Sequence, residues 1–323
     1  MEYPRIKKRQ EKRTGYGAYA DLDELIRLQY KAKGFSFLPR QPIHSILAGR
    51  HASRLRGRGL NFEEIRKYLP GDDIRNIDWK VTARLQKPHV RVYTEERDRP
   101  VLLLIDQRIT MFFGSQQYMK SVTAAEVAAL SAWRIFSAGD RVGAIVFDDT
   151  DMVVIPPQRS RQQVMRILQT VVDKNHRLGT GKGIRPNPDM VNEVMERALR
   201  LAKHDFLLCS ISDGNGIDED TVRLVTLVTA HNDMLACFIY DPLESDLPDT
   251  GPLVVAEEER QLEVDTSDKT LRKQFADDFM NRRHWIQNMS RIRSIPILPF
   301  HTGGNVAEQA REALGYHPPA RMV

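Results

Sequence analysis

From about residue 100 onward, short apolar runs alternate with longer segments in which apolar residues recur every three or four positions. The first run, VLLLID at residues 101–106, has no polar residue before its final aspartate, which is typical of a strand buried on both faces. Similar runs occupy residues 141–149, 205–214, 233–241 and 295–300, and helices are expected at 120–138, 159–174, 189–203, 218–230, 269–289 and 305–314. Strands that alternate with amphipathic helices build βαβ units. The sequence therefore predicts a doubly wound α/β domain with a mostly parallel sheet over residues 100–316.

Residues 1–99 have a different pattern. A helix is expected at residues 21–33, and the alternating segment HVRVYTEE at 89–96 predicts a half-exposed strand. Because this part has few apolar runs, it cannot bury a large core alone. We expect it to be an elaboration that packs onto the α/β domain.

The composition limits the class of protein. Of 323 residues, 41% are hydrophobic and 28% charged, which fits a soluble globular protein. There is no apolar run of about 18 residues, so no transmembrane helix is expected. The basic N-terminus lacks the apolar core of a signal peptide, which favours a cytoplasmic location. In that compartment Cys209 and Cys237, each inside an apolar run, are expected to be buried thiols rather than a disulfide.

The net charge of +5 comes largely from two basic clusters, RIKKRQEKR and GRHASRLRGRG, within the first 60 residues. Such clusters bind nucleic acid or an anionic membrane surface, or form a solvated tail and loop. No aromatic residues alternate with the basic ones as a base-stacking surface requires. The solvated tail is therefore favoured. Nucleic-acid binding stays as a competing hypothesis, which predicts an affinity that falls steeply with salt.

Two expected strands end in aspartate, at Asp106 and Asp213. In an open α/β sheet, ligands bind beyond the carboxyl ends of the strands. Thr110, after the first strand, and Thr180, on a glycine-rich loop, place hydroxyl groups on nearby segments. Carboxylate and hydroxyl oxygens at one sheet edge suit a hard divalent cation such as Mg²⁺.

The order Asp106, Thr110, Thr180, Asp213 resembles the metal-ion-dependent adhesion site of von Willebrand factor A domains. That site uses Asp-x-Ser-x-Ser with a distant Thr and a distant Asp, but Arg108 stands here at the first serine position. A guanidinium carries a fixed positive charge and cannot ligate a metal. We expect Arg108 to replace the ion by pairing with the carboxylates, so that no cofactor is needed. The alternative is that Arg108 points to solvent and the site stays open to Mg²⁺, as in a metal-dependent binding protein or a hydrolase that uses both aspartates.

The segment YLPGDDIRNIDWKVTAR, at residues 68–84, together with EER before the first strand, closely resembles the signature of the domain of unknown function 58 family. The positions that carry this resemblance include Gly71, Asp72, Asp73, Arg75, Asp78, Trp79, Arg84, Glu96 and Arg97. Members of that family resemble partners of MoxR-type AAA+ ATPases, which are thought to assemble or activate other proteins. The resemblance implies a von Willebrand A-like domain, and it establishes no catalytic activity.

The charges of this signature have two interpretations. Asp72, Asp73 and Asp78 are expected to pair with Arg75 and Arg84. The pairs then form either a latch that holds the N-terminal part on the α/β domain or a docking surface for the ATPase. An acid/base catalyst is disfavoured, because neighbouring arginines lower carboxylate pKa values whereas a general acid needs a raised one.

Together these features predict a non-enzymatic adaptor that binds a protein partner and no small-molecule substrate. The partner-binding face is expected at the sheet edge, at Asp106, Arg108, Thr110, Thr180 and Asp213. There Arg108 would bind a carboxylate of the partner directly. The acidic residues after the fourth of the buried runs are expected to form a solvated loop rather than a calcium site, namely Asp241, Glu244, Asp246 and Asp249.

Overall fold

The computed structural model describes residues 17–32, 60–70, 72–95, 99–179, 181–245, 247–249, 251–257, 260–293 and 295–314. The chain divides into two units, residues 1–41 with 99–323 and residues 42–98, and each is described by itself. Some predictions fall outside the described residues: the basic clusters before residue 60, and Gly71, Glu96, Arg97, Thr180 and Asp246.

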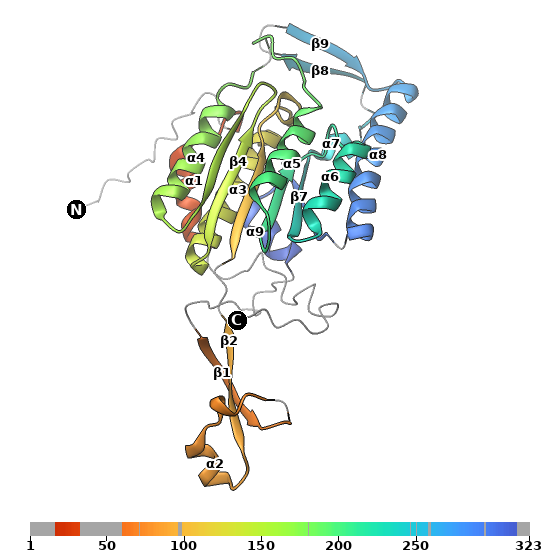
Figure 1. Cartoon of the computed structure of the whole chain (residues 1–323). Helices are drawn as coiled ribbons and strands as arrows, with labels where there is room; N and C mark the ends of the chain where they lie inside the picture. Colours follow the sequence, from red (N-terminus) through yellow and green to blue (C-terminus); the bar gives the residue numbers. More distant parts are fainter. Residues whose placement is uncertain are drawn as a thin grey trace, which may run out of the picture. The chain divides into compact units, whose positions relative to one another are not determined.

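The α/β unit is built on a six-stranded sheet (Figure 1). Its strands are β3 (Pro100–Asp106), β4 (Arg141–Phe147), β5 (Met152–Gln158), β6 (Leu207–Ser212), β7 (Asp233–Tyr240) and β10 (Ile297–His301). They lie in the order β10-β7-β6-β3-β4-β5, and β5 pairs antiparallel with β4 while the other pairs are parallel. The predicted mostly parallel sheet is confirmed. The strand order reverses between β3 and β6, and such a switch point is where open α/β sheets bind ligands.

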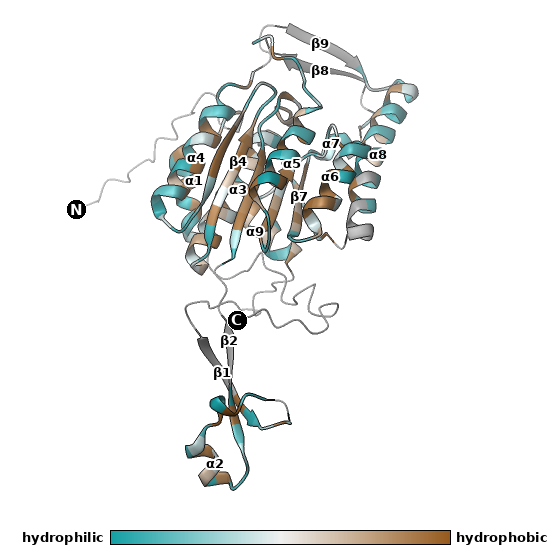
Figure 2. Ribbon diagram, viewed as in Figure 1, coloured by the Kyte–Doolittle hydropathy of each residue, from teal (hydrophilic) through white to brown (hydrophobic). Residues whose placement is uncertain are grey.

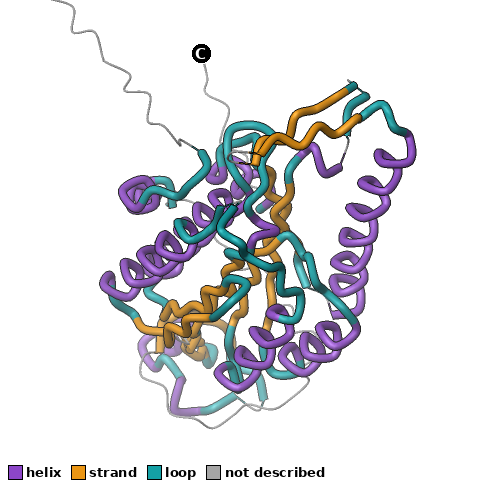
Figure 3. The backbone as a smooth tube through the Cα atoms, turned by 90° about the horizontal axis from the view of Figure 1, so that it is seen from above, coloured by secondary structure: helices purple, strands orange, loops and turns teal. Residues whose placement is uncertain are grey.

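Helices cover both faces of this sheet (Figure 3). They are α3 (Lys120–Ala138), α4 (Arg161–Asn175), α5 (Met190–Leu201), α6 (Glu219–Thr229), α8 (Lys269–Arg293) and α9 (Val306–Ala313). Side chains of β3 alternate between the two faces. Leu103 and Ile105 join the core beneath α3, α4 and α9, whereas Leu102 and Leu104 join the core beneath α5 and α6. Figure 2 shows this as apolar strands between helices that are hydrophilic on the outside.

Helix α3 is the most deeply buried helix of the unit. Its inner face is rich in alanine, and Ala124, Ala125, Ala128, Ala129 and Ala132 are all buried. Small side chains let the helix lie close to the sheet while contributing the best helix propensity. The helix ends at Gly139, whose φ of 90° is the left-handed conformation that glycine adopts readily at a helix C-terminus.

The N-terminal helix belongs to the α/β unit. Helix α1 (Leu22–Arg27) continues into the 3₁₀ turn η1 (Leu28–Tyr30), and Leu25 and Leu28 are buried in the core shared with α3 and α4. The Nε1 of Trp133 donates a hydrogen bond of 3.1 Å to the carbonyl oxygen of Leu25. The expected boundary near residue 99 therefore differs from the structure, in which the chain enters the α/β unit, leaves it for residues 42–98 and returns.

Glu126 of α3 makes the stability of the fold dependent on pH. Burial, and then the charge of Glu24 on α1, raise the pKa of Glu126 to about 7, although Lys31 opposes the shift. The folded protein therefore holds a proton that the unfolded chain has lost, and stability falls as pH rises from about 4.5 to 7. We expect Glu126→Gln to raise the free energy of unfolding by about 1–2 kcal/mol at pH 8 and to leave it unchanged at pH 4. Urea denaturation at both pH values measures the difference.

The matched control is Glu312→Gln on α9, where the glutamate is exposed. It should change stability by less than about 0.5 kcal/mol at either pH. A gain from Glu126→Gln that is equal at pH 4 and pH 8 would contradict the explanation, because a pH-independent gain cannot come from deprotonation of this carboxyl group.

The second unit, over its described residues, is a hairpin of β1 (Leu60–Lys67) and β2 (His89–Glu95). Its connection holds the 3₁₀ turn η2 (Ile74–Asn76) and helix α2 (Trp79–Leu85). The strand β2 was predicted, but β1 and α2 were not. Two further elements that the sequence analysis missed are the hairpin of β8 (Pro252–Glu257) with β9 (Arg260–Asp265) and the short helix α7 (Pro242–Ser245).

Two expectations from composition have structural outcomes. Cys209 on β6 and Cys237 on β7 are both free and buried, as predicted. Among the described residues, the structure contains no helix with the length and apolar character needed to cross a membrane.

Candidate functional site

Asp106 is the last residue of β3 and is paired with Arg108, two residues later in the chain. The Nη2 of Arg108 donates to Oδ2 of Asp106 at 2.7 Å and its Nε to Oδ1 at 3.0 Å. The Oγ of Ser212 donates to the same Oδ2 at 2.7 Å. Both side chains of the pair are essentially buried, with Arg108 only 1% exposed. The ion pair between Arg108 and Asp106 that the sequence predicted is therefore present.

The same burial corrects a second prediction about Arg108. Its Nη2 also donates to the carbonyl oxygen of Asn215 at 2.8 Å, which ties the β3 loop to the β6 loop. Although burial opposes the charge, Asp106, Asp213 and Asp149 hold the pKa of Arg108 above its usual value. Because this guanidinium is buried and already bonded to Asp106 and Asn215, a carboxylate of a partner protein cannot reach it from solvent. The predicted direct contact between Arg108 and a partner is wrong.

Asp213 follows β6 and is paired with Lys120, the first residue of α3. The Nζ of Lys120 lies 2.8 Å from Oδ2 of Asp213 and 2.8 Å from Oε1 of Glu244. The Nη1 of Arg282 on α8 adds a longer contact of 3.8 Å to Asp213. Burial alone would raise the pKa of Asp213, but Lys120 and Arg108 lower it to about 2. This carboxylate is therefore charged and bound to cations of the protein itself.

Lys120 and Glu244 were both missed by sequence reasoning. Lys120 stands at the start of a helix whose other buried residues are uncharged, and that position is the only local signal it gives. Glu244 was assigned to a solvated loop, yet it is buried and its Oε1 also accepts a bond of 3.2 Å from Nη2 of Arg282. The loop prediction is wrong for Glu244 because its side chain is needed to neutralise two cations inside the fold.

Two more aspartates at this edge are structural. Asp241, which follows β7, is fully buried and accepts hydrogen bonds from the backbone and hydroxyl of Ser115 and from the hydroxyl of Thr302. Burial alone would raise the pKa of Asp241, but these hydrogen bonds outweigh the effect of burial and lower the pKa. Asp149, after β4, accepts a bond of 2.6 Å from the backbone N–H of Ile109. Both carboxylates hold the loop that follows β3. The prediction of a solvated loop is therefore wrong for Asp241 as well.

The turn after β6 depends on a glycine. Gly214 has a φ of 73°, and a Cβ at this position would lie 2.7 Å from Cδ1 of Ile286 on α8. A larger residue would therefore be strained in its backbone and would push α8 away. The Asp213–Gly214 sequence thus fixes both the carboxylate and the helix that brings Arg282 to it.

The threonines do not complete a metal site among the described residues. The Oγ1 of Thr110 is buried and has no hydrogen-bond partner there. Thr180 lies outside the described residues. Among the described residues, no three or more His, Cys, Asp or Glu side chains are arranged to hold a metal ion. Within the described part of the site, the residues do not fit a divalent ion, because Asp106 is paired with Arg108 and Asp213 with Lys120.

A pocket of about 570 Å³ opens beside these ion pairs. Its walls come from the loops after β3 and β6, from Glu244 and from α8, and include Ile109, Phe112, Phe113, Ile217 and Phe275. Asp278 and Arg282 supply charges of opposite sign. Lys120, Asp213 and Glu244 also line it. An aromatic and aliphatic hollow with charges of both signs suits a side chain or short segment of another protein.

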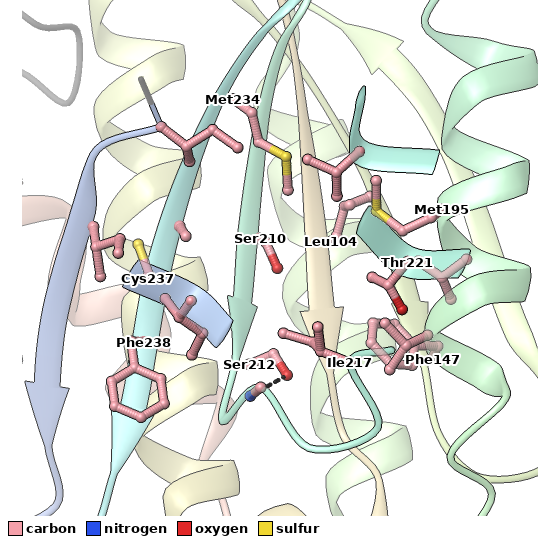
Figure 4. Close-up of a pocket in the computed structure, with 18 residues that line it drawn as sticks. Leu104, Phe147, Met195, Ser210, Ser212, Ile217, Thr221, Met234, Cys237 and Phe238 are labelled. Carbon is pink, nitrogen blue, oxygen red and sulfur yellow. Dashed lines mark hydrogen bonds between the residues drawn. The ribbon is translucent and has the colours of Figure 1, made fainter. Parts of the chain in front are cut away.

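A second, smaller cavity of about 70 Å³ lies between the sheet and helices α5, α6 and α8 (Figure 4). Leu104, Phe147, Met195 and Phe238 line it, and the hydroxyl of Ser212, which also lines it, is already bonded to Asp106. Its described lining has no carboxylate, amine or imidazole. The ionisable group of that lining is the thiol of Cys237, and its contact with Cys209 and its burial raise the pKa of that thiol well above its usual value, so the lining supplies no group that ionises near neutral pH.

The signature residues pair differently from the prediction. Asp72 forms two bonds of 2.8 Å with Arg66 of β1, and Asp78 accepts a bond of 2.8 Å from Nε of Arg91 of β2. Asp78 also caps α2 through the backbone of Lys80 and Val81. These bonds lower the pKa of both carboxylates, the arginine contact being the largest cause in each case.

The expected partners Arg75 and Arg84 are exposed, and no ion pair engages them within the described residues. Asp73 instead accepts a bond of 2.9 Å from the backbone N–H of Arg75. Trp79 is exposed rather than packed under a cation. The pairings were wrong because the arginines that bind lie on the two strands, opposite the loop. All these contacts are internal to the hairpin unit, so they give no support to a latch onto the α/β unit.

Comparison with known proteins identifies related sequences. A family model described as "Protein of unknown function DUF58" matches residues 64–285. The uncharacterised proteins Rv1480 of Mycobacterium tuberculosis and Mb1516 of Mycobacterium bovis are each 28% identical over 287 residues, covering 86% of this chain and 88% of the relative.

Solved structures with similar folds are more distant. BatB from Bacteroides thetaiotaomicron covers 67% of this chain and 95% of its own, at 13% identity and a TM-score of 0.41. A von Willebrand factor type A structure from Catenulispora acidiphila covers 62% of this chain and 44% of its own, at 13% identity and a TM-score of 0.27. Likenesses at these TM-scores are too distant to support conclusions about function.

Proposed function

Because the chain belongs to the DUF58 family, whose function is unknown, we propose from the geometry of the site that it is a non-enzymatic protein-interaction module. The observation that carries the proposal is the neutralisation of both strand-end aspartates by buried cations, Arg108 for Asp106 and Lys120 for Asp213. The adhesion-type sheet edge thus keeps its carboxylates but has protein cations where a metal would bind. The site is a degenerate metal-ion-dependent adhesion site that binds a partner without an ion.

The alternative is a divalent-metal-dependent binding protein or hydrolase that uses Asp106 and Asp213. The electrostatics argue against it. A pKa of about 2 for Asp213 is opposite to what a general acid requires, and a fixed cation next to each carboxylate repels a metal ion. Titration of the protein with Mg²⁺ or Mn²⁺ in a calorimeter should show no micromolar binding, and a micromolar site would favour the alternative.

The contact surface of this module is the pocket beside the ion pairs. It combines exposed aromatic area on Phe275 with the guanidinium of Arg282, and both residue types are enriched in protein interfaces. The ion pairs stiffen the loops that form its walls, which lowers the entropy lost on binding. The resemblance of the signature segment to partners of MoxR-type AAA+ ATPases makes such an ATPase the proposed partner, in the cytoplasm.

The test is a binding titration between the full-length protein and the MoxR-type ATPase of the same organism. Phe275→Asp should weaken the complex by at least about tenfold, since a carboxylate would be placed in the aromatic wall of the pocket. Met280→Asp is the matched control, because Met280 is an exposed apolar residue of the same helix but does not line the pocket. Equal affinities of both variants and the wild type would exclude this pocket, and the lack of any complex would exclude the partner.

A further inference from the structure

The connection between β1 and β2 gathers exposed apolar side chains at one end of the hairpin unit. The two strands close with Lys67 opposite His89, so the chain between them, with η2 and α2, forms the end of the hairpin (Figure 1). We call this end the hairpin tip. It is defined by the apolar residues Leu69, Ile74, Trp79 and Leu85 and the basic residues Arg75, Lys80, Arg84 and Lys87.

The apolar side chains of the hairpin tip are open to solvent. Trp79 is 71% exposed, Ile74 66%, Leu69 58% and Leu85 49%. Few side chains of this unit are buried in its described part, and Val90 is the one large apolar example. A two-stranded hairpin offers no core of its own to cover such groups. Exposed apolar groups gathered within so short a stretch mark an interaction surface.

The charges of the hairpin tip are one-sided. Its carboxylates are engaged within the unit: Asp72 by Arg66, Asp78 by Arg91 and the start of α2, and Asp73 by the backbone of η2. By contrast, no ion pair or side-chain hydrogen bond engages Arg75, Lys80, Arg84 or Lys87 among the residues that the structure describes. The surface that an approaching partner meets is therefore apolar and positively charged.

Of the possible occupants, a bilayer of anionic lipids fits this chemistry best. Tryptophan beside lysine and arginine is the composition of surfaces that lie at the boundary between headgroups and acyl chains. Each basic residue near an anionic surface adds attraction, and the apolar groups add insertion. Protein interfaces instead tend to exclude lysine, and Lys80 and Lys87 both lie at the tip. A second copy of the chain would bring the same positive charges together.

We propose that the hairpin tip docks on the surface of membranes that contain anionic lipids, with Trp79 at the acyl boundary and the basic residues against the headgroups. Docking of this kind needs both an apolar and an electrostatic contribution, because either alone gives only weak binding. The proposal stands independently of the pocket and of the ATPase, since all its residues lie in the hairpin unit.

Sedimentation of the full-length protein with phosphatidylcholine vesicles, with and without phosphatidylglycerol, tests the proposal. The protein should bind vesicles that contain phosphatidylglycerol and not those of phosphatidylcholine alone, and high salt should release it. Trp79→Ala should weaken the partition coefficient by at least about tenfold, and so should Lys80→Glu combined with Lys87→Glu. Brominated acyl chains should quench tryptophan fluorescence in the wild type but not in Trp79→Phe.

The matched control is Tyr30→Ala in the α/β unit, because Tyr30 is an aromatic residue of similar exposure, 74%. It should bind like the wild type. The proposal is overturned if the vesicles do not bind, if Trp79→Ala binds unchanged, or if the wild-type minus Trp79→Phe difference spectrum shows a shielded tryptophan without vesicles. The last result would mean that protein already covers the tip.

Discussion

Replacing Lys120 with methionine should lower the free energy of unfolding by about 3–5 kcal/mol. The reason is that Lys120 is the ammonium shared by Asp213 and Glu244, and both carboxylates are buried. Methionine fills much of the same volume but leaves the two negative charges without their shared ammonium, so that Arg282 and, for Asp213, the more distant charge of Arg108 are the remaining cations. Urea denaturation at neutral pH, followed by circular dichroism, measures the loss.

Two further variants separate the ion pair from simple packing. Lys120→Met combined with Asp213→Asn should be more stable than Lys120→Met alone, because the unpaired charge has been removed. Lys203→Met, at an exposed lysine, should change the stability by less than about 0.5 kcal/mol. If the double variant were no better than the single one, the charge on Asp213 would not be the cause of the loss.

The ion pair also predicts how stability depends on pH. The pKa of Asp213 is about 2 in the folded protein and 3.8 in the usual reference state. Its contribution should be fully present above pH 3.8 and should be lost as the pH falls through about 2. The gap between the wild type and Lys120→Met should therefore close in strong acid.

Arg108→Ser should destabilise the protein by a similar amount, about 3–5 kcal/mol, and should create a response to Mg²⁺ that the wild type lacks. The substitution removes the guanidinium that accounts for most of the bonds to Asp106 and also breaks the link to the carbonyl of Asn215. It places serine at the position where an adhesion-type metal site has one. Thermal unfolding with and without millimolar Mg²⁺ measures both effects.

Arg108→Met is the matched control for the metal response. It should lose as much stability as Arg108→Ser, because Asp106 is left unpaired in both, but without a hydroxyl ligand it should gain less from Mg²⁺. An equal Mg²⁺ response in the wild type and in Arg108→Ser would show that the arginine has not replaced an ion.

Local sequence patterns were enough to place the two strand-end aspartates. The run before Asp106 and the run before Asp213 each predicted a buried strand, and parallel strands bring their carboxyl ends to one edge of a sheet. Arg108 was also within reach of sequence reasoning. Because it lies only two residues from Asp106, its guanidinium is within reach of that carboxylate whatever the rest of the fold does.

Long-range pairings were not within reach. Lys120 lies 93 residues from Asp213 and 124 from Glu244 along the chain, so no periodicity or motif joins them. In the signature segment, the wrong arginines were chosen because the nearest in sequence were assumed to be the nearest in space. The pairing of β1 with β2 instead places Arg66 and Arg91 beside the loop.

The sequence by itself determined the parallel strands of the six-stranded sheet, the long helices between them and the aspartates at the ends of β3 and β6, since each depends on residues only a few positions apart. The tertiary structure alone decided which cations neutralise those aspartates, which arginines hold the signature loop and which apolar groups stay exposed at the hairpin tip. The physical reason is that a buried charge takes whichever opposite charge the packing of distant elements brings within about 3 Å.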